Sequence, residues 1–276
     1  MGRLDDKVVL ITGGSRGIGA ACALACAREG AHVAVAGKTV EPNPKLPGTL
    51  GEVVAGIEGL GRRGLAIQVD VRFEDQVQAM VAKTVETFGR LDVLINNAGA
   101  IWLGDVAEFP AKRYDLVFGV NVRAAFLASQ AALPHLRERG GHVLMMSPPV
   151  DIDAAPGKAP YLVSKMGMTV LARAIDAEEE KVAAHALWPV AMIKTAATLN
   201  FGMGEERDMR TPDILADATL ALLARDPATC SFRAWLDEEV LREEGVTDLS
   251  RYRCVPDHEP SPASIQLVQP SWSRST

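Results

Sequence analysis

The chain of 276 residues is poor in aromatic side chains, which make up 5% of it, and it contains four cysteines. No two cysteines form a C-x-x-C pair, and the five histidines are scattered along the chain. This spacing predicts no metal site and favours reduced thiols in a cytosolic protein over a disulfide framework. The cysteines are Cys22, Cys26, Cys230 and Cys254.

The sequence also lacks long hydrophobic runs and a strong excess of either charge. No uninterrupted apolar run reaches the roughly 18 residues that a membrane span needs. Strand-like sequence begins by Val8, so we expect no signal peptide. The net charge of −6 is small for this length and argues against a nucleic-acid or anionic-membrane partner. We therefore expect a soluble, cytoplasmic protein with no membrane span.

Apolar residues, at 48%, are abundant enough for a large core. Short apolar runs alternate with stretches of helical periodicity, a pattern that predicts a doubly wound parallel sheet. We expect one domain over residues 1–255, followed by an irregular tail over 256–276. The expected strands are Val8–Thr12, His32–Ala36, Ala66–Val71, Val93–Asn96, His142–Ser147, Ala184–Trp188 and Ser231–Leu236. The expected helices are Gly17–Arg28, Glu52–Leu60, Glu74–Phe88, Lys112–Arg139 and Pro160–Glu180.

The first chemical signal is the stretch "KVVLITGGSRGIGA", in which a strand runs through a glycine-rich turn into a helix. Glycines let such a turn bend tightly, let the backbone approach a pyrophosphate, and let the helix pack close to the strand. The helix N-terminus presents unpaired N–H groups to the phosphates. Because strand and helix flank the turn, the pattern indicates dinucleotide binding rather than a turn without a ligand.

A second signal is the pair Tyr161 and Lys165, four residues apart on an expected helix, so that both side chains lie on one face. A phenol that exchanges protons near neutrality needs its pKa lowered by about 2–3 units, and a nearby ammonium group has that effect. Ser147 lies at the carboxyl end of a strand, where open α/β sheets bind ligands, and its hydroxyl could bond a substrate oxygen. Asn121 interrupts a long helical pattern.

These motifs, in this order, resemble those of the short-chain dehydrogenase/reductase family, with T-G-x-x-x-G-I-G, "VDV", "NNAG", Asn121, Ser147 and "YLVSK". The resemblance implies a single-domain, Rossmann-like doubly wound parallel sheet of about seven strands flanked by helices. It also implies a catalytic set of Asn121, Ser147, Tyr161 and Lys165, in which Asn121 holds a water and Lys165 also holds the nicotinamide ribose. The cofactor-binding residues that it implies are Gly13, Gly14, Ser15, Arg16, Gly17, Ile18, Gly19, Lys38, Thr39, Asp70, Val71, Asn97, Ala98, Gly99, Tyr161, Lys165, Pro189, Ile193 and Thr195.

A closer resemblance is carried by "GKT", the proline-rich loop after it, "SPP", "ALWP" and "DEEVLREEG". These are similar to the branch typified by hydroxysteroid dehydrogenase-like protein type two, whose bacterial members are often named citronellol or citronellal dehydrogenases. Two positions depart from the wider family. Val190 stands where glycine is usual, and His185 stands where asparagine is common, which leaves the hydrogen bonding around His185 open.

Cofactor choice is read at the tip of the second strand, where an acidic residue would indicate NAD. This chain has Gly37, Lys38 and Thr39 there, and Arg16 lies in the glycine turn. Two basic residues and no carboxylate before Glu41 predict NADP(H) and make NAD(H) the weaker alternative. The proline-rich loop from Glu41 to Leu50 either covers the adenosine end of the cofactor or serves as a rigid spacer.

Several apolar residues follow strand ends and predict a lipophilic pocket, although such residues are as often plain core. The segment 196–210 could form a lid over the site or an ordinary surface loop. We expect an NADP(H)-dependent interconversion of a lipophilic alcohol and its aldehyde or ketone, with Tyr161 as proton donor or acceptor. The alternatives are a non-catalytic, dinucleotide-sensing or scaffold protein of the same fold, and a related lyase or epimerase that uses the cofactor transiently. The pocket candidates are Ile101, Trp102, Leu103, Val150, Ile152, Trp188, Met192 and Ile193.

Assembly is predicted from the two longest expected helices, Lys112–Arg139 and Pro160–Glu180, which carry more apolar surface than one sheet face can cover. The resemblance implies that these helices pair across a two-fold axis. The alternative is burial beneath the chain's own C-terminal segment. We expect a homodimer or homotetramer in which Ala124, Ala128 and Ala132, spaced four apart, let the helices approach closely.

Overall fold

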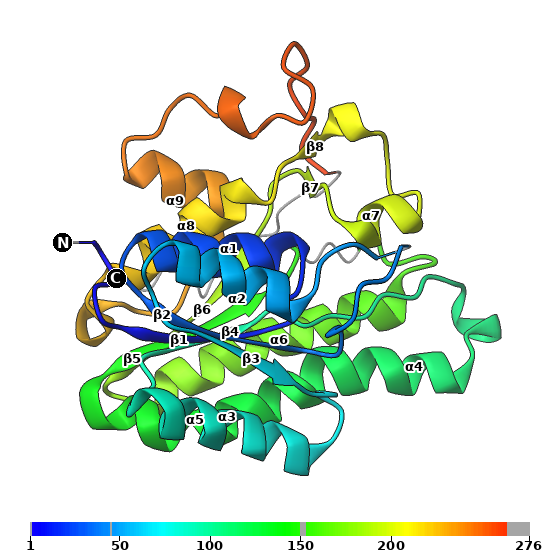
Figure 1. Cartoon of the computed structure of the whole chain (residues 1–276). Helices are drawn as coiled ribbons and strands as arrows, with labels where there is room; N and C mark the ends of the chain where they lie inside the picture. Colours follow the sequence, from blue (N-terminus) through cyan, green and yellow to red (C-terminus); the bar gives the residue numbers. More distant parts are fainter. Residues whose placement is uncertain (1, 45, 150–152, 264–276) are drawn as a thin grey trace.

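The computed structural model describes residues 2–44, 46–149 and 153–263. Its centre is a seven-stranded sheet in the order β3-β2-β1-β4-β5-β6-β9, and all the neighbouring strands run parallel. The predicted doubly wound parallel sheet is confirmed (Figure 1). The strands are β1 Val8–Thr12, β2 His32–Gly37, β3 Gly64–Gln68, β4 Val93–Asn96, β5 Gly141–Met146, β6 Val182–Trp188 and β9 Ala234–Leu236.

Helices cover both faces of the sheet, as Figure 1 shows. One face is covered by α1 Gly17–Arg28, α2 Leu50–Gly59, α8 Asp213–Leu223 and α9 Asp237–Glu243. The other is covered by α3 Glu74–Phe88, α5 Ala124–Arg139 and α6 Ala159–Glu178, with α4 Ala111–Phe118 ahead of α5. Short elements complete the described chain: α7 Ala196–Asn200, the strand pair β7 Met192–Ile193 and β8 Met209–Arg210, and the turns Val106–Glu108, Glu206–Asp208, Pro227–Thr229 and Ser250–Tyr252.

The strand order reverses at β1, which lies between β2 and β4. The connections therefore leave β1 and β4 in opposite directions, and a crevice opens at the carboxyl ends of these two strands. This is the end at which the glycine turn and the "NNAG" turn lie. The topology alone brings the two motifs together.

The predicted boundaries differ from the structure in two instructive places. The third strand was expected at Ala66–Val71 but spans Gly64–Gln68, because it pairs with β2 alone and the last pair is Gly37 with Gln68. The long helix expected at Lys112–Arg139 is two α-helices joined by a π-helical turn over Gly119–Arg123. Asn121 lies inside that turn, which matches its interruption of the helical pattern.

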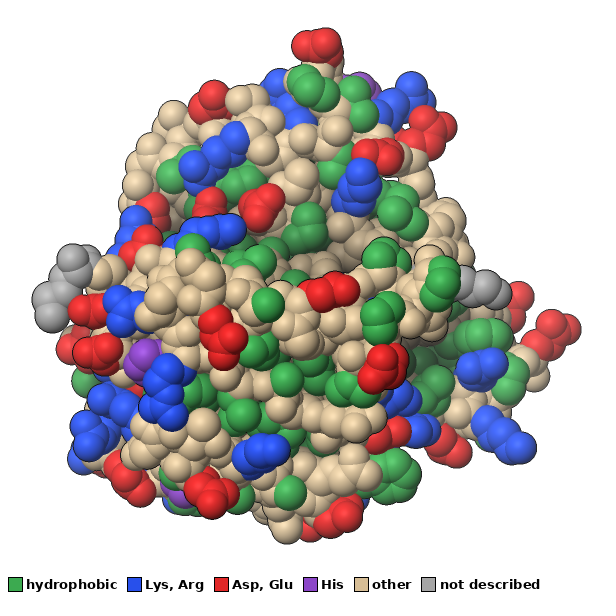
Figure 2. Space-filling model, in the orientation of Figure 1, with side chains coloured by type: hydrophobic (Ala, Val, Ile, Leu, Met, Phe, Trp, Pro, Cys, Tyr) green, Lys and Arg blue, Asp and Glu red, His purple; other side chains and the backbone are tan. Residues whose placement is uncertain are grey.

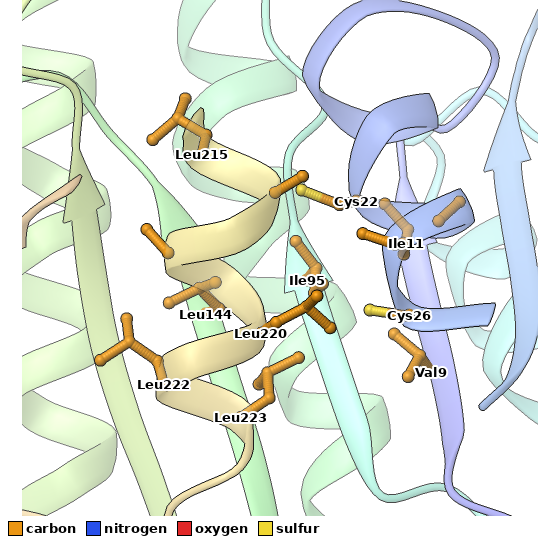
Figure 3. Close-up of a cluster of buried hydrophobic side chains, with 14 of the residues drawn as sticks. Val9, Ile11, Cys22, Cys26, Ile95, Leu144, Leu215, Leu220, Leu222 and Leu223 are labelled. Carbon is orange, nitrogen blue, oxygen red and sulfur yellow. The ribbon is translucent and has the colours of Figure 1, made fainter. Parts of the chain in front are cut away.

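Helices α8 and α9 were not predicted. Helix α8 carries buried leucines that pack in one cluster with α1 and the centre of the sheet, and Figure 3 shows Leu220 beside Cys26. All four cysteines are free. Cys22 and Cys26 are buried, and burial raises the pKa of the Cys22 thiol to about 12.

The continuous stretch Ala111–Arg139 is long and apolar enough, by length and composition, to cross a membrane. The core helix of a globular domain passes the same test, and α5 packs one side against the sheet. Figure 2 shows charged side chains of both signs interspersed over the face that it presents.

The tail predicted to begin at residue 256 is described as far as Ala263. Residues 256–263 contain no helix or strand, and the backbone N–H of Ala263 donates to the carbonyl oxygen of Val190 at 2.9 Å. The other residues of the predicted tail, 264–276, lie outside the described residues, and the boundary at 255 stays a prediction.

His185, whose hydrogen bonding the sequence left open, lies in the middle of β6 and is buried. Within the described ranges neither ring nitrogen has a hydrogen-bond partner, and the ring packs edge-on against Trp235 at 6.4 Å between centroids. Burial lowers the pKa of His185 to about 3. The ring is therefore neutral at pH 7.

Replacing His185 with glutamine should reduce the loss of stability in mild acid. Because the folded pKa lies below the unfolded value near 6.5, the stabilisation is complete above that pH and is lost as the pH falls toward the folded value. Between pH 7 and pH 5 this histidine should lower the free energy of unfolding by about 2 kcal/mol. Urea unfolding of the wild type and His185→Gln at pH 7 and pH 5 measures the difference directly. An equal loss in both proteins would contradict the prediction.

Candidate active site and cofactor cradle

The glycine turn leads from the end of β1 into α1 and brings two backbone segments into close contact. Gly13 has φ of +68°, which favours glycine. A Cβ on Gly19 would lie 2.4 Å from the carbonyl oxygen of Gly13, so the first turn of α1 tolerates no side chain there. Helix α1 begins without a side-chain cap and without an acidic residue in its first turn. Its first N–H groups therefore suit a phosphate, and the cradle fits a dinucleotide.

The "NNAG" turn after β4 is fastened to this glycine turn by two side chains. The Asn97 amide nitrogen donates to the carbonyl oxygens of Thr12 and Gly13, each at 3.0 Å. The Thr12 hydroxyl accepts from the backbone N–H groups of Asn97 and Ala98, each at 3.1 Å. The Asn97 side chain thus joins the ends of β1 and β4 and holds the crevice in shape.

Tyr161 and Lys165 lie one turn apart on α6, as the spacing predicted. Burial raises the pKa of Tyr161 to about 12 and lowers the pKa of Lys165 to about 8. The buried Lys165 ammonium donates to the carbonyl oxygen of Met146 at 2.9 Å, at the end of β5. A Cβ on Gly99 would lie 3.7 Å from the Lys165 Nζ, so this ammonium borders the "NNAG" turn.

Ser147 and Asn121 flank the lysine but bond elsewhere. The Ser147 hydroxyl donates to the carbonyl oxygen of Lys165 at 2.9 Å and also lies 3.3 Å from the Thr169 hydroxyl. Asn121 accepts from the backbone N–H of Ala100 at 2.7 Å and donates to the Ser164 hydroxyl at 2.8 Å. Both side chains therefore tie α6 and the π-helical turn to the strand ends. The structure brings all four predicted catalytic residues to one end of the sheet.

The family can now be identified from comparisons with known proteins. The model of the short chain dehydrogenase family matches residues 7–204. A hydroxysteroid dehydrogenase-like protein 2 from Xenopus tropicalis is 42% identical over 262 residues, which cover 93% of this chain and 63% of that protein. The chain belongs to the short-chain dehydrogenase family. It spans a little under two thirds of the length of that curated relative.

Solved structures similar to this chain include other dehydrogenases. A putative dehydrogenase from Xanthomonas campestris has a TM-score of 0.90 and 43% identity, covering 94% of this chain and 97% of that one. An alcohol dehydrogenase from Thermococcus sibiricus, complexed with 5-hydroxy-NADP, has a TM-score of 0.73 and 26% identity, covering 83% and 95%. Carveol dehydrogenase from Mycobacterium avium, in complex with NAD, shares the fold at 22% identity and a TM-score of 0.75, covering 87% and 100%. The family is therefore one of nicotinamide-dependent oxidoreductases, and these neighbours include complexes of both cofactor types.

In this short-chain dehydrogenase the tip of β2 carries a charged cluster. The Lys38 ammonium lies 3.5 Å from an Asp70 carboxylate oxygen, and Arg72 bonds the same carboxylate at 2.5 Å. Hydrogen bonds from Arg72, more than the charge of Lys38, hold the pKa of Asp70 down at about 2. Arg72 was not among the predicted site residues, and its position two residues after Asp70 is the signal that could have found it. Thr39 and Val71 adjoin the same cluster in sequence.

The proline-rich loop packs on the glycine turn through Arg16. The guanidinium donates to three loop carbonyl oxygens, those of Leu46 at 3.3 Å, Pro47 at 3.1 Å and Gly48 at 3.0 Å. A Cβ on Gly48 would lie 2.6 Å from the carbonyl oxygen of Ser15. The loop is therefore fixed against the glycine turn and holds Arg16 in place, and whether it covers the adenosine end of the cofactor stays a prediction.

The segment after β6 carries the remaining predicted cofactor residues. Pro189 ends the strand, Ile193 is buried in β7, and Thr195 caps the short helix α7 by accepting from the N–H of Thr198 at 3.2 Å. The Thr195 methyl group lies 3.4 Å from where a Cβ on Gly17 would be. The segment therefore runs from the end of β6 to the glycine turn.

The predicted pocket residues divide into two groups. Trp188 is buried and packs with Ala186 and Leu236, so it belongs to the core. Trp102 is partly exposed, and the Arg113 guanidinium stacks 4.1 Å from its ring centroid. Ile101, Leu103 and Met192 are likewise partly exposed, whereas Val150 and Ile152 lie outside the described residues. The predicted lid, 196–210, holds α7, the turn Glu206–Asp208 and β8.

Proposed function

We propose that the chain is an NADP(H)-dependent oxidoreductase that interconverts a lipophilic alcohol and its aldehyde or ketone. The observation that carries the proposal is the placement of Tyr161 and Lys165 on one face of α6, beside the turns that form the cofactor cradle. The nicotinamide supplies or accepts the hydride when the cofactor is bound. What the chain contributes is the proton and the alignment.

In this proposal Tyr161 exchanges the proton with the substrate oxygen. With its pKa raised to about 12 the phenol is neutral at pH 7, which is the form needed to donate a proton during carbonyl reduction. For alcohol oxidation the same group must lose its proton, and positive charge on Lys165 favours that form. Ser147 and Asn121 would hold α6 at the correct distance from the strand ends through the bonds described above.

Preference for NADP(H) is supported by the charges at the tip of β2. Lys38 and Arg72 contribute two positive charges against the one negative charge of Asp70, and Arg72 binds that carboxylate at the shorter distance. Lys38 keeps 65% of its side chain exposed. It is therefore available to a 2′-phosphate, which needs positive charge at this point of the fold.

Free thiols support the further proposal that the protein works in the reducing cytoplasm. All four cysteines are unpaired, and two are deeply buried in the core. Protein thiols stay reduced in that compartment.

We also propose that the protein assembles as a homodimer, or a tetramer of such dimers, through α5 and α6. A groove of about 450 Å³ is lined by the end of α4, the π-helical turn, Phe126 of α5 and Leu171 of α6, and Phe126 is 47% exposed. Val163 and Val170 of α6 are 57% and 54% exposed. The partner that this surface suits is a second copy of the chain, because a two-fold axis would pair each apolar face with itself.

The predicted role of the alanines in that contact is wrong. Ala124, Ala128 and Ala132 are buried in this chain's own core, against the sheet. Their small size lets α5 approach the strands rather than a partner helix. The helix that the sequence showed as apolar on several sides therefore uses its alanine side internally and presents Phe126 outward.

Tyr161→Phe should lower turnover by about a hundredfold or more, the range for loss of a proton-transferring group, and leave cofactor affinity nearly unchanged. Lys165→Ala should lower both the turnover and the affinity for the cofactor. Turnover is followed by the absorbance of the reduced nicotinamide on a panel of carbonyls and alcohols, with Tyr114→Phe as the matched control. If Tyr161→Phe kept more than a tenth of the wild-type rate, the assignment of Tyr161 as the proton-transferring group would be refuted. Cofactor binding without turnover in the wild type would favour the non-catalytic alternative.

Cofactor preference is tested by charge reversal at the strand tip. The wild type should bind NADP(H) more tightly than NAD(H), and Lys38→Asp should narrow or invert the ratio because it places a carboxylate where the 2′-phosphate lies. Lys83→Asp, an exposed lysine on α3, is the control for net charge. The measurement is a fluorescence titration with all four nucleotides. Equal wild-type affinities for NADP(H) and NAD(H) would contradict the prediction.

Phe126→Glu should weaken the assembly, since it places a charge in the proposed helix contact. Leu60→Glu, which changes an exposed apolar residue of α2's C-terminal end instead, should leave the assembly intact. Light scattering and sedimentation at micromolar concentration give the mass of each protein. A wild type that is a stable monomer under these conditions would rule out the proposed dimer.

A further inference from the structure

Two of the attachments that hold the segment from Pro189 to Thr195 to the rest of the molecule lead to the start of α9. Under the proposed function this segment borders the nicotinamide end of the cofactor, because it begins at the end of β6, where the Leu187 carbonyl oxygen accepts from the Ser147 N–H at 3.2 Å. Its far end contacts the glycine turn through Thr195. A segment in this position must be held accurately, because a small displacement moves the reacting ring.

The first attachment compensates for a proline. The ladder between β6 and β9 ends at the pair Trp188 and Leu236, and Pro189 has no N–H with which to extend it. The next N–H, that of Val190, donates instead to the Asp237 carboxylate at 3.0 Å. The same oxygen accepts from the backbone N–H of Glu238 at 2.8 Å, which fixes its orientation. Asp237 is 0% exposed, so no water competes for this bond in the fold.

The second attachment runs through Arg210. Ile193 pairs with Arg210 between β7 and β8, and the Lys194 N–H donates to the carbonyl oxygen of Arg210 at 2.9 Å. The Arg210 side chain is 2% exposed, and its guanidinium donates to a Glu238 carboxylate oxygen at 2.9 Å. The Arg210 guanidinium also donates to Glu259 at 2.7 Å, and Glu238 also accepts from Arg242 at 2.6 Å, so Glu238 holds Arg210 as one member of a charge network.

We propose that Asp237 and Glu238 are positioning residues for the nicotinamide end of the cofactor, Asp237 through Val190 and Glu238 through Arg210. Neither residue touches the cofactor in this proposal, which rests on the proposed function. Adjacent side chains at the start of α9 thus hold both halves of the 189–195 segment. The C-terminal part of the chain adds a third bond, from the Ala263 N–H to the Val190 carbonyl oxygen.

Asp237→Ala and Asp237→Asn separate positioning from general stability. Each variant is titrated with the whole dinucleotide and with the fragment that lacks the nicotinamide riboside. Asp237→Ala should weaken binding of the whole dinucleotide by about tenfold, the equivalent of one buried hydrogen bond, and should change fragment binding less than about twofold. Asp237→Asn keeps an acceptor for the Val190 N–H and should restore most of the lost affinity. Glu243→Ala, on the same helix and facing Arg225, is the control.

Equal losses for the dinucleotide and its fragment, or no loss for either, would overturn the proposal. A wild type that binds neither would overturn the proposed function instead. Should Asp237→Ala fail to fold, Ala263→Pro removes the donor on the other side of Val190 and should weaken the whole dinucleotide selectively in the same way. If Ala263→Pro left the affinities for the whole dinucleotide and for its fragment unchanged, that result would count against the proposal.

Discussion

Two backbone turns, one after β1 and one after β4, are joined by the side chains of Thr12 and Asn97, and the rest of the site depends on that junction. A parallel sheet leaves the carboxyl ends of its strands open where the strand order reverses. There the backbone N–H and carbonyl groups of both turns need partners, and the two side chains supply them. The crevice so formed has a rigid floor before any ligand enters it.

Helix α6 is the second element on which the site depends, because it carries both proposed reacting groups and packs on the sheet. The buried Lys165 binds the end of β5, and Ser147 and Asn121 tie the same helix to the strand ends. Burial moves the two titrating groups in opposite directions, raising the pKa of Tyr161 and lowering that of Lys165. In both groups burial favours the neutral form, and positive charge brought by a bound ligand would favour the phenolate.

The C-terminal third contributes structure that the motifs do not contain. Helix α8 packs beside α1 on the same face of the sheet, and α9 begins with the acidic pair that holds the segment after β6. Val190, the departure from the usual glycine, is bonded through both its N–H and its carbonyl oxygen. In this chain the backbone at that position is restrained by partners rather than left to the freedom of a glycine.

The sequence by itself determined the sheet, most of its strands, the glycine turn and the residues grouped at the site, because strand periodicity and glycine spacing are local signals. It did not reveal α8, a helix of 11 residues of which nine are buried, or the start of α9. Whether Ala128 faces a partner or the sheet, and whether Arg16 faces a phosphate or loop carbonyls, was decided by tertiary packing. Each depends on which distant segment occupies the neighbouring space. Likewise, the partner of the Val190 N–H lies 47 residues away, at a distance that no local pattern encodes.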